Sequence, residues 1–278
     1  ALCRHPDIAK VSFTGSVATG QKVQQACSQK NIKPLTLELG GKSALVIFED
    51  SDVESAVAAT MLANFLNQGQ VCTNATRVFV QRGILEAFTQ ALVKEANEKL
   101  IVGDPLKDET RVGANINEGH LERILGFVES AKQEGGSVLR GGIRVHPEGV
   151  EGGFYFDPAI ISGLSDSSRP VREEIFGACC LLLPFDTEEE VIKRVNDTTF
   201  GLASGIFSRN LARAHRVAAR IQAGTVFINT YNDTEVHVPF GGFKNSGYGR
   251  ENCPDTLKAY SQVKAIYVNV QEKTEHCF

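Results

Sequence analysis

The stretch PLTLELGGKSALVIF, residues 34–48, indicates how the chain around it folds. Its apolar runs predict two short strands, 34–39 and 43–48, and the adjacent glycines Gly40 and Gly41 end the first of them. The second strand is almost continuously apolar and contains β-branched residues, as is typical of a strand buried in a parallel sheet. Because the composition also changes at Gly40-Gly41, we expect a hinge between two domains there.

Strand and helix patterns alternate on both sides of this stretch. Residues 10–15 predict a strand, and Ser16 predicts the N-cap of a helix over 17–29. Residues 141–158 are rich in Gly and Pro and predict a loop or hairpin. Such alternation indicates an α/β fold with a mostly parallel sheet. The other predicted strands span 76–80, 179–185, 202–208 and 224–229, and the other predicted helices span 53–67, 84–100, 119–135, 187–197 and 211–222.

The composition describes a folded protein and disfavours several functional classes. With 278 residues, 42% of them hydrophobic and 22% charged, the chain has enough apolar side chains for one large domain or two smaller ones. The net charge of -4 is spread along the chain without a basic block, so we expect no nucleic-acid partner. No apolar run reaches the roughly 18 residues of a membrane span, so we expect no membrane partner.

Cysteine and histidine usage gives further expectations. The seven cysteines include no C-x-x-C pair, and an odd number does not suit a disulfide framework. We therefore expect a reducing compartment, the cytoplasm. The six histidines show no metal-ligand spacing, so we expect no metal site.

One cysteine lies in a setting that differs from the others. Cys72 belongs to NFLNQGQVCTN, residues 64–74, where a polar turn follows a predicted helix. Lone cysteines are most often small buried residues, and the pair Cys179-Cys180 in an apolar strand fits that description. A thiol on a polar turn can instead project towards a substrate, so Cys72 is the candidate nucleophile.

Glu38 is the second candidate, because it ends an apolar strand just before the two glycines. A glutamate buried there is costly unless it is paired or functional. Burial would raise its pKa and suit it to general-base work near neutral pH. The alternative, a glutamate on an edge strand facing water, is equally consistent with the sequence.

Three glycine-containing segments remain. FTGSVATG, residues 13–20, places a turn before a helix N-terminus, where free N–H groups favour phosphate, although the G-x-G-x-x-G fingerprint is absent. EEIFGA, 173–178, precedes a buried strand, and PFGGFKNSGYGRE, 239–251, predicts a long irregular loop. Each is also consistent with a purely structural loop.

Taken in order, the motifs F-T-G-S, L-E-L-G-G-K, G-Q-x-C, E-E-I-F-G and P-F-G-G-x-K-x-S-G-x-G-R-E resemble the aldehyde dehydrogenase superfamily, and they cover almost the whole chain. The sequence stretches that contain these motifs resemble most closely the amino- and trimethylammonio-aldehyde branch of that superfamily. The resemblance implies NAD-dependent oxidation of a small-molecule aldehyde to a carboxylic acid through a cysteine thiohemiacetal and thioester. At Ala178 the chain departs from the proline usual in the family.

The resemblance also implies roles for individual residues. Cys72 falls on the nucleophile and Glu38 on the general base. Glu174 falls on the residue that holds the nicotinamide ribose, and Phe176 on a neighbour that helps to place the ring. The turn that meets the cofactor pyrophosphate corresponds to Ser16, Val17, Ala18, Thr19 and Gly20.

In domain terms, the chain resembles the C-terminal half or so of a subunit. Residues 1–40 would be the remainder of a Rossmann-like NAD-binding domain, 41–255 the catalytic domain and 256–278 an oligomerisation arm. Within that arm, 260–270 predicts an edge strand that needs a partner, so we expect a homo-oligomer, a dimer or tetramer.

Two other functions stay open at this point. A truncated, non-catalytic relative would serve as a structural or interaction protein, and a cysteine hydrolase would use Cys72 without the cofactor. For an aminoaldehyde substrate, the resemblance points to the segment 228–242. There Tyr231 would contact a quaternary ammonium through its ring, and Asp233 or Glu235 would add charge attraction. The alternative is that the two carboxylates face water on a surface loop.

Overall fold

The structure is a computed structural model, and it describes residues 1–270. Its main body is a seven-stranded sheet in the order β11-β10-β3-β4-β9-β8-β5. All neighbouring strands in it are parallel except β5 and β8, which confirms the predicted α/β fold with a mostly parallel sheet. The strands are β3 (Ala44–Ile47), β4 (Arg77–Gln81), β5 (Ser137–Arg140), β8 (Ala159–Ser162), β9 (Cys179–Phe185), β10 (Ala203–Phe207) and β11 (Thr225–Ile228).

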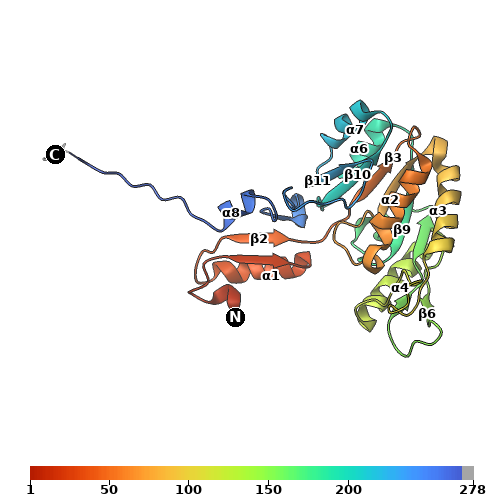
Figure 1. Cartoon of the computed structure of the whole chain (residues 1–278), viewed down its shortest axis with the longest axis horizontal. Helices are drawn as coiled ribbons and strands as arrows, with labels where there is room; N and C mark the ends of the chain where they lie inside the picture. Colours follow the sequence, from red (N-terminus) through yellow and green to blue (C-terminus); the bar gives the residue numbers. More distant parts are fainter. Residues whose placement is uncertain (271–278) are drawn as a thin grey trace.

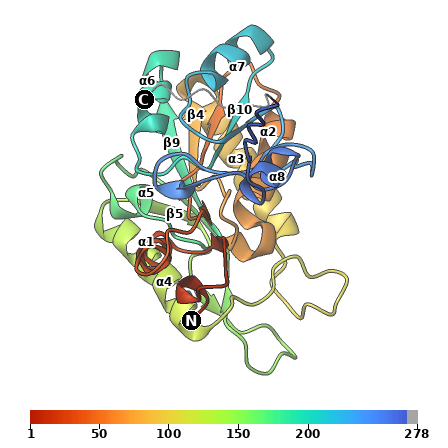
Figure 2. The same cartoon turned by 90° about the vertical axis from the view of Figure 1, so that its left-hand side faces the viewer.

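Helices flank this sheet, as Figures 1 and 2 show. Helix α2 packs against α3, and α7 packs against β10 and β11. The central strands are buried on both faces, since every side chain of β3 and β10 is buried. The helices are α2 (Val53–Phe65), α3 (Leu85–Lys99), α4 (Glu118–Gln133), α5 (Arg169–Arg172), α6 (Glu188–Asn196) and α7 (Leu211–Ala218).

A second, smaller unit lies beside the main body (Figure 1). Strand β1 (Val11–Thr14) pairs in parallel with β2 (Leu35–Glu38), and α1 (Val17–Ser28) connects them. The third strand, β12 (Gly247–Tyr248), comes from far along the chain and pairs antiparallel with β2. The chain thus passes between the two sheets at Gly40-Gly41, where we expected the hinge, but the small sheet also takes a strand from within the predicted catalytic range 41–255.

The Gly- and Pro-rich segment forms a hairpin of β6 (Arg144–Val145) and β7 (Tyr155–Phe156), as one of its two predicted forms. Other elements differ from the expectations, since β8, α5 and β12 were not predicted. After the short helix α8 (Asp255–Ala259), residues 261–270 run away from the body without forming a strand (Figure 1). The predicted edge strand needs a second chain to pair with, so it stays a prediction. The rest of the predicted arm, 271–278, lies outside the described residues.

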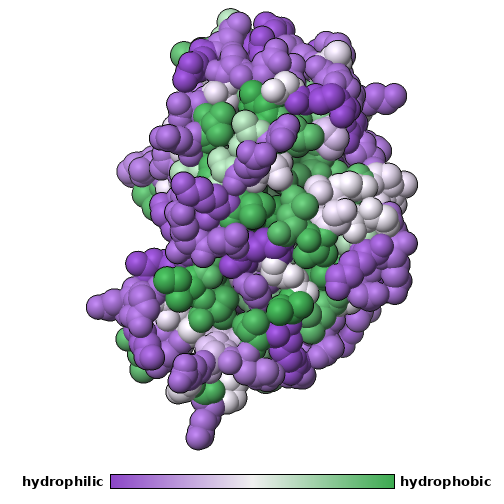
Figure 3. Space-filling view, turned by 90° about the vertical axis from the view of Figure 1, so that its right-hand side faces the viewer, coloured by the Kyte–Doolittle hydropathy of each residue, from purple (hydrophilic) through white to green (hydrophobic). Residues whose placement is uncertain are grey.

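The core and the surface follow the sequence pattern. Cys179 and Cys180 are both 0% exposed, which confirms their predicted packing in the core. On the face shown in Figure 3, apolar side chains gather through the middle and hydrophilic ones dominate the rim. No helix within residues 1–270 combines the length and apolar character needed to cross a bilayer.

Candidate active site

One cavity of about 390 Å³ brings most of the candidate residues together. It lies where the small sheet meets the main body, and its wall includes residues from both. Cys72 and Glu38 share this cavity, so the candidate nucleophile and the candidate base line the same space. Its lining residues are Thr14, Gly15, Ser16, Glu38, Leu39, Gly40, Cys72, Arg123, Glu174 and Phe176.

The N-terminus of α1 opens onto this cavity. Ser16 caps the helix, and its Oγ accepts a hydrogen bond from the Thr19 N–H at 3.3 Å. The positive end of the helix dipole therefore lies at the cavity wall, which suits an anionic group such as a phosphate. Of the predicted turn, Ser16 lines the cavity, whereas Val17, Ala18, Thr19 and Gly20 form the first turn behind it.

Glu38 is buried, and no group in the described part of the chain bonds to its carboxylate. Its side chain is 6% exposed, and neither Oε1 nor Oε2 has a hydrogen-bond partner among residues 1–270. Burial, reinforced by the charge of Glu251 and opposed by Arg250, raises the pKa of Glu38 to about 7. Strand β2 lies between β1 and β12, so the alternative of a water-facing edge glutamate is wrong.

Cys72 follows a strained turn. Helix α2 ends at Phe65, and Asn67, Gln68 and Gly69 then all adopt positive φ, at 51°, 56° and 73°. For residues other than glycine this conformation costs of order 1–3 kcal/mol each. Backbone strain of this kind is typical of turns at functional sites, and this turn leads into the segment that carries Cys72.

The thiol of Cys72 is partly exposed and is mainly protonated near neutral pH. Burial raises its pKa, as do the nearby carboxylates of Glu174 and Glu38, while the N–H groups of Cys72 and Thr73 lower it. The thiol therefore needs a proton acceptor before it can attack. Glu38, in the same cavity and with a pKa near 7, is a suitable acceptor.

Glu174 is held from several sides. Its Oε1 accepts a hydrogen bond from the Gly41 N–H at 2.9 Å, and its main-chain oxygen accepts one from Arg123 Nη2 at 2.5 Å. Burial raises the pKa of Glu174, and the Gly41 N–H, Lys42 and Arg123 counteract that rise. A carboxylate fixed in this way, with Oε2 still available, can accept hydrogen bonds from ligand hydroxyl groups.

Lys42 is a residue that sequence reasoning missed. It is 1% exposed, and its Nζ donates to the Pro170 main-chain oxygen at 2.6 Å. Burial, together with the positive charge of Arg77, lowers the pKa of Lys42 to about 7. A lysine that directly follows two glycines and precedes a buried strand is the signal that could have identified it.

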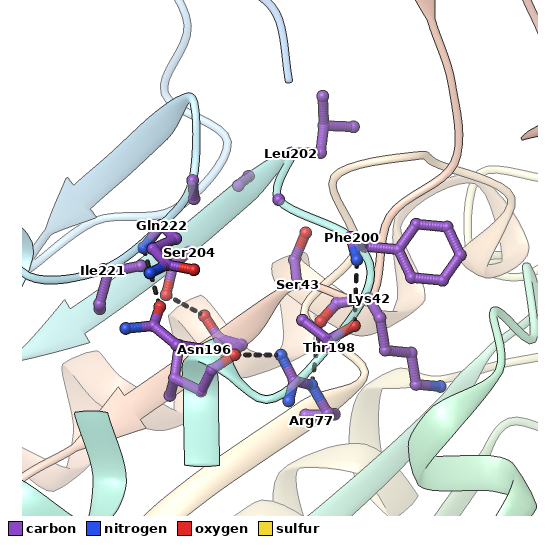
Figure 4. Close-up of a pocket in the computed structure, with 15 residues that line it drawn as sticks. Lys42, Ser43, Arg77, Asn196, Thr198, Phe200, Leu202, Ser204, Ile221 and Gln222 are labelled. Atoms are coloured by element: carbon purple, nitrogen blue, oxygen red, sulfur yellow. Dashed lines mark hydrogen bonds between the residues drawn. The ribbon is translucent and has the colours of Figure 1, made fainter. Parts of the chain in front are cut away.

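Arg77 is buried beside Lys42, next to a small cavity of about 10 Å³. Figure 4 shows both side chains at this cavity, with the guanidinium of Arg77 joined to main-chain oxygens. It donates to the oxygens of Lys42 and Val195, each at 2.9 Å. The arrangement is structural, because a cavity of that size holds no more than a water molecule.

The predicted substrate residues do not join this cavity. Tyr231 is 1% exposed and donates its hydroxyl to the Thr73 oxygen at 2.7 Å. That burial contradicts the expected contact of its ring with a substrate cation, and it makes Tyr231 a support for the chain next to Cys72. Asp233 and Glu235 are exposed, which agrees with the alternative that these carboxylates face water on a surface loop. They line a separate cavity of about 210 Å³.

The sequence is similar to those of known enzymes. Residues 1–266 match the model of the aldehyde dehydrogenase family. The 4-trimethylaminobutyraldehyde dehydrogenase of Oryzias latipes is 56% identical over 96% of this chain, and that of Homo sapiens is 54% identical over 97%. These alignments cover 53% and 54% of those proteins, so the chain spans about half the length of the curated relatives it matches.

Solved structures show the same fold. A mutant betaine aldehyde dehydrogenase from Staphylococcus aureus, in complex with NAD+, superposes with a TM-score of 0.95 at 34% identity, over 99% of this chain and 56% of that one. An NAD+ complex of an aldehyde dehydrogenase from Bacillus cereus gives a TM-score of 0.92 at 41% identity, over 97% and 54%.

Proposed function

Because this chain belongs to the aldehyde dehydrogenase family, we propose that its Cys72 cavity serves the NAD-dependent oxidation of an aldehyde to a carboxylic acid. The substrate class that we propose is the amino- and trimethylammonio-aldehydes, the class named in the relatives with the highest identities given above. One observation carries the proposal: Glu38, buried and without a hydrogen-bond partner among the described residues, shares a cavity with Cys72.

In this proposal Cys72 and Glu38 carry the covalent chemistry. Glu38 takes the thiol proton, and Cys72 Sγ forms a bond to the aldehyde carbon, giving a thiohemiacetal. Bound NAD+ supplies the acceptor for the hydride that leaves this carbon. Glu38 passes the thiol proton on to solvent and then removes a proton from a water that attacks the resulting thioester. The carbon–sulfur bond breaks with its electron pair on Cys72 Sγ, and the carboxylic acid leaves.

The residues around the cavity fit the cofactor. The N-terminus of α1 at Ser16 suits its pyrophosphate, and the fixed carboxylate of Glu174 suits the hydroxyl groups of its nicotinamide ribose. Phe176 lines the same cavity, where it would limit the positions open to the nicotinamide ring.

Assembly and location are also part of the proposal. We propose a homo-oligomer in which the arm from residue 256 onward contacts another subunit. Large apolar side chains in 263–270 are strongly exposed, Val263 at 103% and Tyr267 at 95%, as expected of a segment that needs a partner. The expected reducing compartment, the cytoplasm, stays a prediction from the cysteines.

The test uses the natural polypeptide and measures NADH formation with 4-trimethylaminobutyraldehyde. Cys72→Ala should abolish NADH formation and also the hydrolysis of p-nitrophenyl acetate. Cys180→Ala, at a cysteine buried in the core, is the matched control and should keep turnover. Wild-type turnover in Cys72→Ala would contradict the assignment of the nucleophile.

The same experiment separates the two alternatives. A native polypeptide with a mass near 30.2 kDa that neither binds NAD+ nor hydrolyses the ester would favour the non-catalytic relative. Ester hydrolysis without any NADH formation would favour the cysteine hydrolase.

A further inference from the structure

Two side chains of α4 hold the main chain around Glu174 and Phe176. His120 Nε2 lies 2.7 Å from the main-chain oxygen of Phe176, and Arg123 Nη2 lies 2.5 Å from that of Glu174. A carbonyl oxygen only accepts, so Nε2 of His120 carries the proton in this contact. The two donors lie three residues apart and therefore share one face of the helix.

The segment that they hold needs such support. Phe176 adopts a positive φ of 59°, which is unfavourable for a bulky side chain. The ring of His120 also meets that of Phe176 edge-on, with centroids 6.0 Å apart. A hydrogen bond at the carbonyl together with a ring contact favours this conformation over relaxed ones in which the Phe176 side chain would point elsewhere.

The held segment also packs against the turn before Cys72. A Cβ on Gly69 would lie 2.1 Å from the carbonyl carbon of Gly177, so the two main chains are in direct contact. On its other side, a Cβ on Gly177 would meet Ile124 of α4 at 2.5 Å. The segment 174–177 is therefore confined between α4 and the turn at residue 69, and the donors of α4 fix its position along that gap.

We propose that His120 and Arg123 are positioning residues that set Glu174 and Phe176 for the cofactor. The inference rests on the proposed function, because it takes NAD+ as the ligand of this cavity. His120 gives the sharper test. Arg123 itself lines the cavity and would have effects of its own, whereas His120 is not among the lining residues and contacts one of them, Phe176.

The test compares His120→Ala with His120→Gln in the natural polypeptide. The amide of glutamine can donate to the Phe176 oxygen, so it restores the hydrogen bond without the imidazole. Glu122→Gln is the matched control, because Glu122 lies on the same helix but its carboxylate bonds Arg144 at 2.8 Å. Calorimetry measures the Kd for NAD+, and p-nitrophenyl acetate without NAD+ measures acylation of Cys72.

We expect His120→Ala to raise the Kd for NAD+ about tenfold and to change the acylation rate less than twofold, while His120→Gln and Glu122→Gln bind NAD+ as the wild type does. An unchanged Kd in His120→Ala would overturn the proposal. So would equal losses of cofactor affinity and acylation, or a glutamine variant as weak as the alanine variant, since either indicates a general structural role.

Amide hydrogen exchange measured without NAD+ tests the positioning role of His120 independently of the proposed function. His120→Ala should accelerate amide exchange in 174–178 about tenfold and leave α3 unchanged. Unchanged exchange in 174–178 would overturn the positioning role even if the enzyme is active. A wild-type protein that binds no NAD+ would overturn the proposed function and the cofactor part of this inference together.

Discussion

The main-chain N–H of Gly41 donates a 2.9 Å hydrogen bond to the carboxylate of Glu174, although 133 positions separate the two residues. Gly40 leaves room for the same carboxylate, because a Cβ at this position would lie only 2.2 Å from Glu174 Oε2. The two glycines therefore leave the space that Glu174 occupies and supply the donor that fixes it.

Gly40→Ala should displace Glu174 and raise the Kd for NAD+ at least tenfold. The physical reason is the steric conflict between the new methyl group and the carboxylate. Gly126→Ala is the control, because a Cβ there meets no heavy atom within 4 Å. It should leave the Kd unchanged and stabilise α4 by up to about 1 kcal/mol. Calorimetric titration and thermal unfolding measure both effects, and a Gly40→Ala protein with normal affinity would contradict the expected conflict.

Glu38→Gln should slow hydrolysis of the thioester about 10²–10⁴-fold, because the amide cannot accept the proton of water. In the wild type, this step should speed up as the pH rises through about 7, where the pKa of Glu38 lies. Acylation of Cys72 should slow as well, since the amide cannot take the thiol proton, but less than hydrolysis does. Rapid-quench or stopped-flow measurement should then show a burst of NADH followed by a slower steady state in the variant. A steady-state rate equal to that of the wild type would remove Glu38 from the mechanism.

The same pKa makes a prediction for stability. The folded protein holds the Glu38 proton more tightly than the unfolded chain does. The resulting contribution to stability is fully present below the unfolded pKa of about 4.5, and it is lost as the pH rises through the folded pKa of about 7. Glu38→Gln removes this dependence. The stability of the variant relative to the wild type should therefore increase between pH 5 and pH 8, and a difference in Tm that does not change with pH would argue against a raised pKa.

Lys42→Met tests the buried lysine. Its pKa is about 7 in the fold, below its unfolded value of 10.5, so its burial costs stability at neutral pH and the cost fades towards pH 10.5. Met fills a similar volume without charge. The gain in unfolding free energy from Lys42→Met should therefore be larger at pH 7 than at pH 10. Chemical denaturation at both pH values measures it, and the opposite order would show that the bond to the Pro170 oxygen matters more than the buried charge.

Neutralising Asp233 and Glu235 together, as Asn and Gln, should reduce the preference for cationic aldehydes if these carboxylates attract the substrate. The expected change is a several-fold fall in kcat/KM for 4-trimethylaminobutyraldehyde, with kcat/KM for a neutral aldehyde of equal length unchanged. Glu148→Gln with Glu151→Gln, two exposed carboxylates of another loop, is the control for net charge. Equal kcat/KM for charged and neutral aldehydes in the wild type would end the aminoaldehyde assignment.

Deletion from Tyr260 onward should leave a monomer or an aggregate, because it removes the exposed apolar segment that is proposed to contact another subunit. Sedimentation velocity measures the change. A deletion variant that keeps the oligomeric state of the wild type would show that other surfaces make the assembly.

The sequence predicted those parts of the fold and the site whose evidence is local. The apolar run at 179–185 became β9, and the predicted cap Ser16 accepts a hydrogen bond at the start of α1. The helix predicted over 53–67 ends instead at Phe65, because Leu66 and Asn67 leave the helical conformation. Strand β8 was missed because it directly follows the Gly- and Pro-rich segment.

The parts that could not be predicted depend on residues distant in sequence. Whether Glu38 faces water or a buried cavity depends on β12, a two-residue strand in a glycine-rich loop that carries no strand pattern of its own. The burial of Lys42 and Tyr231 likewise follows from the neighbours that the fold supplies. Tyr231 looked like a ligand contact only because a loop sequence does not show which of its side chains turn inward.

The late strand β12 has a consequence for synthesis of the chain. The hydroxyl of Ser246 donates to the Gly40 oxygen at 2.7 Å, across 206 positions, and Gly247 pairs with Glu38. A growing polypeptide therefore emerges with Glu38, the proposed base, on an open sheet edge. The environment of Glu38 is completed only after more than two hundred further residues have left the ribosome. During that interval the carboxylate is hydrated and ordinary in acidity, so the proton chemistry of Glu38 should begin only when translation of this region is finished.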